Sequence, residues 1–226
     1  MLLSLLKGGD MLSIFMELCV SAFVVFCIIP IHEYAHALVA TKLGDQTARL
    51  SGRLTLNPLA HIDILGAVMI FLVGFGYGKP TPVNVRNTKL KNKKLAMALI
   101  ALAGPLSNII VAFISVFLRY VVILIASKRG GELTTTVLAL NIFFQYSAII
   151  NINLAVFNLI PIPPLDGSRI LFAFLPAKFY FGIMKYERYI NIIILVLLIS
   201  GALTTPLSYL SNLIYSGFNR LFYLIF

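Results

Sequence analysis

Long runs of apolar residues alternate with short polar segments along most of this chain. A helix needs about 20 predominantly apolar residues to cross the hydrocarbon core of a bilayer. We expect such helices over residues 11–41, 95–126 and 133–159, and a terminal helical hairpin over residues 188–226. The pattern therefore predicts an all-α polytopic membrane protein with about five to six transmembrane helices.

Two neighbouring stretches do not fit that pattern. Residues 64–77 are apolar, but the stretch is only about 14 residues long and glycines interrupt it, which is typical of a piece that enters the membrane and returns. In residues 46–63, Leu50, Leu54 and Leu56 are spaced as in a short extended segment ahead of an Asn-Pro turn. We therefore expect a re-entrant segment beside a β-hairpin-like segment, both near the candidate site described below.

The composition supports a membrane location. Hydrophobic residues make up 60 % of the chain and charged residues 12 %, whereas about a quarter of the residues in a soluble domain are charged. The net charge of +10 comes from Lys and Arg in short loops, as the positive-inside rule expects, so nucleic acid is not an expected partner. The length fits a single membrane domain over residues 1–226, with its core over about residues 11–175.

Ionisable side chains interrupt the first apolar run in the sequence Pro-Ile-His-Glu-Tyr-Ala-His of residues 30–36. On a helix, His32 and His36 lie on one face, where two imidazoles can bind one metal ion. Glu33 lies beside them and could act on metal-bound water. The arrangement H-E-x-x-H on a helix is a known metalloprotease signature.

A second candidate lies far along the chain. Of eight acidic residues, Glu33 and Asp166 are the two that we find embedded in apolar sequence, where a charge is costly and usually functional. A catalytic zinc ion needs a third protein ligand, and two His with one carboxylate is a known set. Three prolines and Gly167 end the helix before and around Asp166. Asp166 is therefore the leading candidate for the third ligand.

The direction of the helices gives an independent argument. His32, His36 and Asp166 all lie toward the C-terminal ends of their spans, so the two spans must run in the same direction for these side chains to meet. The span over residues 95–126 allows this if residues 64–77 do not cross. Nine Lys and Arg residues in the segment 42–94 then lie on the cytoplasmic side, together with the active site.

Together these segments resemble the site-2 protease family (peptidase family M50) of intramembrane zinc metalloproteases. The resemblance rests on residues 32–36 and 158–167, and residues 52–63 and 103–108 resemble the compact prokaryotic branch of that family. It covers roughly residues 14–175. Larger bacterial members carry a PDZ module between the two motifs, whereas this chain has only the loop of residues 79–94 there. The membrane of a prokaryotic cell is the expected location.

The resemblance implies roles for particular residues. His32, His36 and Asp166 would bind zinc, Glu33 would be the catalytic acid/base, and the substrate would be a transmembrane helix of a membrane protein. It also places functional asparagines at two positions of the apolar span before Asp166; hydrogen bonding between helices is the alternative role for these amides, and Asn108 is a weaker candidate of the same kind. The two positions are Asn153 and Asn158.

Other polar residues have a simpler expected role. An exposed strand edge formed by Arg53, Leu54 and Thr55 could bind an extended substrate by backbone pairing, or these residues could form a plain connector. His61 is expected to be structural or to support the ligands. Asp45 and Asp63 are expected to be solvated.

Two other classes of function remain open at this level. A membrane transporter or sensor could use the same three ligands for zinc passage, and a catalytically idle protein could bind transmembrane helices without cleaving them. The sequence leaves the substrate and the oligomeric state undetermined.

Overall fold

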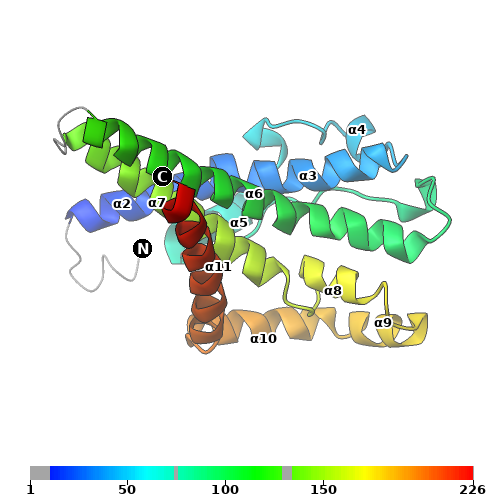
Figure 1. Ribbon diagram of the computed structural model, residues 1–226. Coiled ribbons are helices and arrows are strands. Elements are labelled where there is room, and N and C mark those ends of the chain that lie inside the picture. Colours follow the sequence, from blue (N-terminus) through cyan, green and yellow to red (C-terminus); the bar gives the residue numbers. More distant parts are fainter. Residues whose placement is uncertain (1–10, 74–75, 129–133, 226) are drawn as a thin grey trace. The chain divides into compact units, whose positions relative to one another are not determined.

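The computed structural model describes residues 11–73, 76–128 and 134–225. Within these residues the regular structure is entirely helical, which confirms the all-α prediction (Figure 1). The predicted β-hairpin-like segment is wrong, because the described residues include no strand. The backbone N–H groups of residues 50–53 instead donate to carbonyl groups of residues 46–49, so this segment folds into turns.

The chain divides after Gly104 into two compact units. Helix α6 begins in the first unit and continues past Pro105 into the second. The first unit contains α2 (Met11–Phe23), a π-helical turn (Val24–Ile28), α3 (Ile29–Lys42), α4 (Thr47–Leu50), a 3-10 turn (Pro58–Ala60), α5 (Ile64–Val73), a second 3-10 turn (Val85–Asn87) and the start of α6 (Lys93–Lys128). The second contains the rest of α6, α7 (Thr135–Asn158), α8 (Asp166–Leu171), α9 (Ala177–Met184), α10 (Glu187–Ile199) and α11 (Thr204–Ile225).

One nearly continuous helical rod carries the His-Glu motif. Helix α2 leads into α3 through the π turn Val24–Ile28, which ends just before Pro30. Pro30 has no backbone N–H to donate to the preceding turn of the helix. We attribute the π turn to this missing hydrogen bond. The motif residues follow in the regular part of α3, where a spacing of four residues places side chains on one face.

Helix α5 is too short to cross a bilayer. Its ten residues extend about 15 Å at 1.5 Å per residue. The chain returns to the start of this helix, because a Cβ atom added to Gly66 would lie 2.0 Å from the carbonyl oxygen of Tyr77. Only a residue without a side chain allows this close approach of the two backbones.

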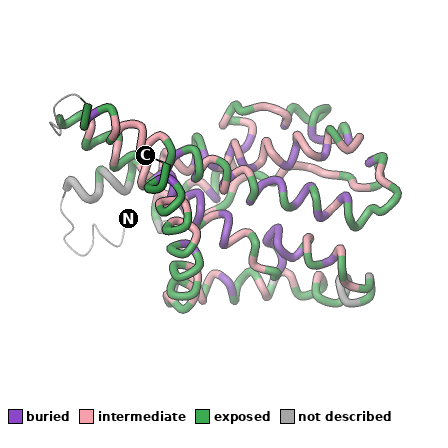
Figure 2. Tube along the Cα trace, in the orientation of Figure 1, coloured by how far each residue is buried: buried purple, intermediate pink, exposed green. Residues whose placement is uncertain are grey.

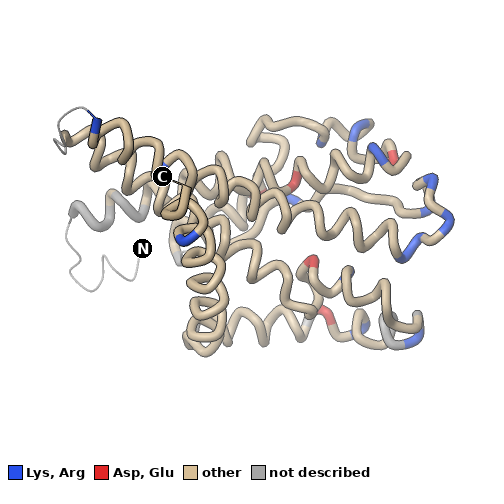
Figure 3. The backbone as a smooth tube through the Cα atoms, viewed as in Figure 1, with Lys and Arg blue, Asp and Glu red and all other residues tan. Residues whose placement is uncertain are grey.

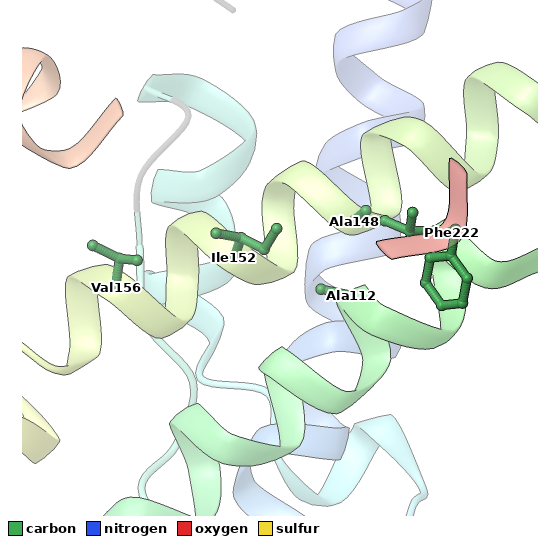
Figure 4. Packing of buried hydrophobic residues seen from close by; sticks show 6 residues of the cluster. Ala112, Ala148, Ile152, Val156 and Phe222 are labelled. Carbon is green, nitrogen blue, oxygen red and sulfur yellow. The ribbon is translucent and has the colours of Figure 1, made fainter. Parts of the chain in front are cut away.

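The core of the second unit combines alanines with larger apolar residues. Ala112 and Val116 of α6, Ala148, Ile152 and Val156 of α7, and Phe222 of α11 are buried against one another (Figure 4). Alanine at the contacts lets the helix backbones approach closely, as in many membrane bundles. At the same interface the hydroxyl groups of Ser115 and Ser147 are 2.9 Å apart.

In the part of the chain that the structure describes, three helices are long and apolar enough to cross a membrane: Leu18–Lys42, Lys93–Lys128 and Thr135–Asn158. A shorter apolar segment, Tyr189–Leu198, lies in α10. Large apolar residues remain exposed on the long helices, including Ile110 and Ile114 of α6 and Phe143 of α7. Exposed positions recur along these helices (Figure 2). Charged residues gather in loops and near helix ends (Figure 3). The molecule is an integral membrane protein.

Candidate metal centre

The two motif histidines meet on one face of α3. Both side chains are buried, and their Nε2 atoms are 3.1 Å apart. Two nitrogen ligands of a tetrahedral zinc ion, each roughly 2.0–2.1 Å from the metal, are separated by about 3.3 Å. The structure therefore gives the pair the spacing of two ligands of one zinc ion, as the sequence predicts.

A hydrogen bond fixes the orientation of one ring. Nδ1 of His36 donates to the carbonyl oxygen of Ile100 at 2.7 Å, because a carbonyl can only accept. The neutral ring then has its lone pair on Nε2, the atom that faces His32. Outer hydrogen bonds of this kind orient metal-binding histidines and raise the basicity of the ligand atom. Sequence reasoning did not identify Ile100, because a main-chain acceptor leaves no signal in residue type.

The residue beside the pair is a glycine. A Cβ atom added to Gly104 would lie 2.4 Å from Nε2 of His36 and 2.6 Å from Nε2 of His32. Heavy atoms do not tolerate such contacts, so the missing side chain preserves the space in front of both nitrogen atoms. The donor set and this space fit a zinc ion.

Glu33 is half-buried on the same helix, and both its carboxylate and its main-chain carbonyl accept hydrogen bonds from Thr81. The backbone N–H of Thr81 donates to Oε2 of Glu33 at 2.8 Å, and the Thr81 hydroxyl donates to the main-chain carbonyl of Glu33 at 3.0 Å. Sequence reasoning missed Thr81. Its position between Pro80 and Pro82 was the available signal, because the prolines leave one isolated N–H group there.

Asp166 belongs to the second unit. Helix α7 ends at Asn158, and turns in residues 159–165 lead to Asp166 as the first residue of α8. The Asp166 side chain is buried. The predicted break of the helix before this residue is confirmed. A buried carboxylate at a helix start is a candidate metal ligand.

The candidate asparagines have different surroundings. The amide of Asn158 donates to the carbonyl of Leu154 in its own helix at 2.9 Å, and Asn108 is fully buried in α6. Asn153 lies beside a cavity of about 120 Å³ between α7 and α11. Ser208, Ser211, Asn212 and Tyr215 line the α11 side of this cavity. The roles of these three amides remain predictions.

The residues expected to form a strand edge lie in a loop, and the Arg53 side chain stabilises that loop by hydrogen bonds. Arg53 is buried, and its guanidinium donates to the main-chain carbonyls of Ala60, Lys79 and Pro80. Leu54 and Thr55 are half-buried beside it.

His61 fits its expected structural role. It is buried, and its Nε2 atom is 2.8 Å from the carbonyl oxygen of Thr55. This hydrogen bond joins two parts of the same loop.

The expectation that Asp45 is solvated is wrong. Its side chain is fully buried and accepts hydrogen bonds from the backbone and hydroxyl of Thr47, the backbone of Asn84 and the amide of Asn87. Burial acts to raise the pKa of Asp45, but these hydrogen bonds outweigh it and hold the pKa below the usual 3.8. Asp63 is half-buried and accepts from the backbone N–H of Gly66 at the start of α5.

Two histidines with the spacing of zinc ligands and a neighbouring glutamate, on a helix able to cross a membrane, are the signature of membrane-embedded metallopeptidases. Residues 20–201 match the model of peptidase family M50, and the chain belongs to that family. The expected resemblance is thereby confirmed.

Named relatives agree with this assignment. The chain is 41 % identical over 169 residues, 75 % of each chain, to the Bacillus subtilis (strain 168) protein "Putative zinc metalloprotease YwhC". It is 28 % identical over 176 residues to "Putative zinc metalloprotease Rip2" of Mycolicibacterium smegmatis, covering 76 % of this chain and 64 % of that protein. A segment of 34 residues, 15 % of this chain and 8 % of the relative, is 56 % identical to "Regulator of sigma-W protease RasP" of Bacillus subtilis (strain 168). No solved structure matches.

The protein is therefore an intramembrane zinc metalloprotease of the site-2 protease type, with membrane proteins as its substrates. The sequence-based predictions of a hydrolase, of zinc and of membrane integration are confirmed.

Proposed function

We propose that His32, His36 and Asp166 bind the zinc ion and that Glu33 is the general acid/base in cleavage of transmembrane helices. The spacing of 3.1 Å between the two Nε2 atoms, with Gly104 keeping the adjacent space open, is the observation that carries this proposal. Asp166 is included because it is a buried acid at a break in an apolar helix, and because two His with one carboxylate is a known catalytic set.

Each residue has a distinct task in this proposal. Zinc, when bound, makes water a stronger acid and polarises the scissile carbonyl. Glu33 accepts the proton of the attacking water and delivers it to the leaving amine. Its Oε2 atom is held by Thr81, so Oε1 is the oxygen that we assign to proton transfer. The Ile100 carbonyl holds the His36 ring in the tautomer that coordinates through Nε2.

The exchange Glu33→Gln tests the division of roles. We expect full zinc content and a loss of cleavage of a model transmembrane substrate by about 10²–10⁴-fold, because glutamine cannot exchange the proton. Glu187→Gln, the same exchange in α10, is the matched control and should retain activity. Wild-type cleavage by Glu33→Gln would refute the role of Glu33, and zinc flux through vesicles without proteolysis would favour a transporter.

We further propose that the asparagines of α6 and α7 contact the unwound substrate. Amides can hydrogen-bond a peptide backbone that has left its helix, which a helical substrate must do before hydrolysis. Asn153, Asn158 and Asn108 are the residues concerned. Asparagine-to-leucine exchanges should raise KM without loss of zinc; an unchanged KM in all three would refute this role.

Membrane topology is a separate proposal. Of the expected five to six crossings, we assign three to the α2–α3 rod, α6 and α7, and we expect the others in the terminal hairpin of residues 188–226. We assign a re-entrant role to α5. The return of the chain to Gly66 and the short length of α5 support that role. The Lys and Arg of residues 79–94 support a cytoplasmic position for the polar end of α3 and the active site (Figure 3). A reporter inserted in the loop 127–132 should be exported; a cytoplasmic reporter would refute this topology.

A further inference from the structure

An extended segment, residues 79–84 with the sequence Lys-Pro-Thr-Pro-Val-Asn, runs past Glu33 in the first unit. We call it the strap. Pro80 and Pro82 fix their own φ angles and disfavour helical conformations for Lys79 and Thr81. The sequence of the strap therefore favours a stiff, extended backbone, and its prolines leave the N–H of Thr81 without an N–H group on either neighbour.

The start of the strap is held by a buried cation and by the loop before it. The backbone N–H of Lys79 donates to the carbonyl of His61 at 2.8 Å. Arg53, which is only 6 % exposed, donates to the carbonyls of Lys79 and Pro80, each at 3.4 Å, and to that of Ala60. One guanidinium thus joins the loop of residues 53–61 to the first two residues of the strap.

The end of the strap is held by a buried anion. Oδ2 of Asp45 accepts the backbone N–H of Asn84 at 2.6 Å, and its Oδ1 accepts the Asn87 amide at 3.3 Å. Beyond this point, the N–H of Lys89 donates to the carbonyl of Leu43 at 2.7 Å. The strap is therefore fixed at its end to the loop that follows α3, the helix that carries Glu33.

Between these two attachments, Thr81 contacts Glu33 twice. Its backbone N–H binds one carboxylate oxygen, and its hydroxyl binds the main-chain carbonyl of the same residue. A glutamate side chain has three rotatable bonds and would otherwise sample several positions beside the histidines. With Oε2 held, only rotations that preserve this hydrogen bond remain.

We propose that the strap is a positioning device for Glu33, with Thr81 as the positioning residue and Asp45 and Arg53 as its attachments. The inference rests on the proposed role of Glu33 as acid/base. The strap holds the carboxylate so that Oε1 faces the reacting water, and it keeps Glu33 from turning toward the metal as an additional ligand. Changes to the strap therefore lower kcat and leave zinc content and KM unchanged, since none of these residues contributes a zinc ligand.

The main test removes the backbone donor. Thr81→Pro deletes the N–H that holds Oε2, and we expect kcat to fall by about 10²-fold with normal zinc content and KM, because small displacements of a catalytic group have effects of this size. Thr81→Val keeps the N–H and loses only the hydroxyl, so a loss of about threefold is expected. Thr81→Ser keeps both donors and should restore wild-type kcat. Thr88→Val, which removes a hydroxyl bonded to the Val85 carbonyl in the same loop, is the matched control and should retain kcat.

A second variant tests the same idea if Thr81→Pro does not fold. Asp45→Asn weakens the attachment at Asn84, and we expect kcat to fall by about three- to tenfold at constant zinc content and KM. A folded Thr81→Pro protein with wild-type kcat, or kcat losses that simply follow zinc loss, would overturn the inference.

The variant Glu33→Gln separates this inference from the proposed function. If it is inactive while Thr81→Pro and Asp45→Asn keep wild-type kcat, the strap inference fails and the role of Glu33 stands. If Glu33→Gln is active, the proposed function fails.

Discussion

The two units of the chain use their buried polar groups differently. In the first unit, Asp45, Arg53 and Glu33 all accept from or donate to main-chain groups of loops. In the second unit, Ser115 binds Ser147 on the neighbouring helix, and Arg119 of α6 donates to side chains of α7 and α11. The polar groups of the first unit thus fix irregular backbone around the motif, and those of the second hold regular helices together.

This difference shows where chemistry can be placed in a small membrane protein. A helix satisfies its own backbone, so its interfaces need few polar groups. The loops around Glu33 leave buried backbone groups that need partners, and charged side chains supply some of them. We therefore expect substitutions of the loop-binding polar residues of the first unit to lower turnover as well as stability, and substitutions of the polar residues between α6, α7 and α11 to affect stability alone.

Among the tests of this comparison, the largest effect is expected for Gly104→Ala. The new Cβ would enter the space in front of His32 and His36, so zinc affinity should fall by at least about 10–100-fold and cleavage with it. Gly217→Ala is the matched control, because a Cβ at that helical position meets nothing within 4 Å. Metal analysis and cleavage assays on both proteins check this; full zinc content in Gly104→Ala would contradict the site geometry.

Arg53→Met should affect stability and turnover together. The exchange removes the donor of three loop carbonyls, and we expect a loss of about 3 kcal/mol in the free energy of unfolding. Arg49→Met, at an exposed position of α4, is the control and should change little. Thermal unfolding in detergent measures the difference, and equal stability of the two variants would remove the contrast between the units.

Arg119→Leu tests a polar contact between helices of the second unit. Arg119 donates to Asn141 at 2.6 Å and to Tyr215 at 2.8 Å, so its loss should cost about 1–2 kcal/mol of stability. Zinc content and cleavage should stay at wild-type levels below the unfolding temperature. Arg220→Leu, exposed on α11, serves as the control. Loss of zinc in Arg119→Leu would show that the units do not divide their tasks in this way.

The smallest effect concerns Asp45 in acid. Because hydrogen bonds hold its folded-state pKa below 3.8, its ionised form stabilises the fold at pH values above 3.8, and this contribution disappears as the pH falls through the folded-state pKa. The difference in unfolding free energy between wild type and Asp45→Asn should therefore be constant from pH 7 to about pH 5 and shrink below about pH 4. A difference that changes most near neutral pH would contradict the assignment.

The sequence predicted the motif helix, the break before Asp166 and the family, because apolar runs, H-E-x-x-H spacing and prolines are local signals. It failed for residues 51–56, since a leucine pattern does not reveal that the backbone bonds back to α4. It failed for Asp45 and did not find Thr81, because Asp45 accepts from Asn84 and Thr81 donates to Glu33, each about 40 or more positions away in the chain. The types of two residues do not reveal that distant parts of the chain meet.

Metal analysis of purified His36→Ala and Asp166→Ala tests the central claim most directly. At equal protein concentration, wild type should contain one zinc ion per chain. Both variants should lose most of the zinc together with cleavage activity. Asp63→Asn, which alters an acid bonded at the start of α5, should retain the metal. Full zinc retention in both His36→Ala and Asp166→Ala would contradict the assignment of the site.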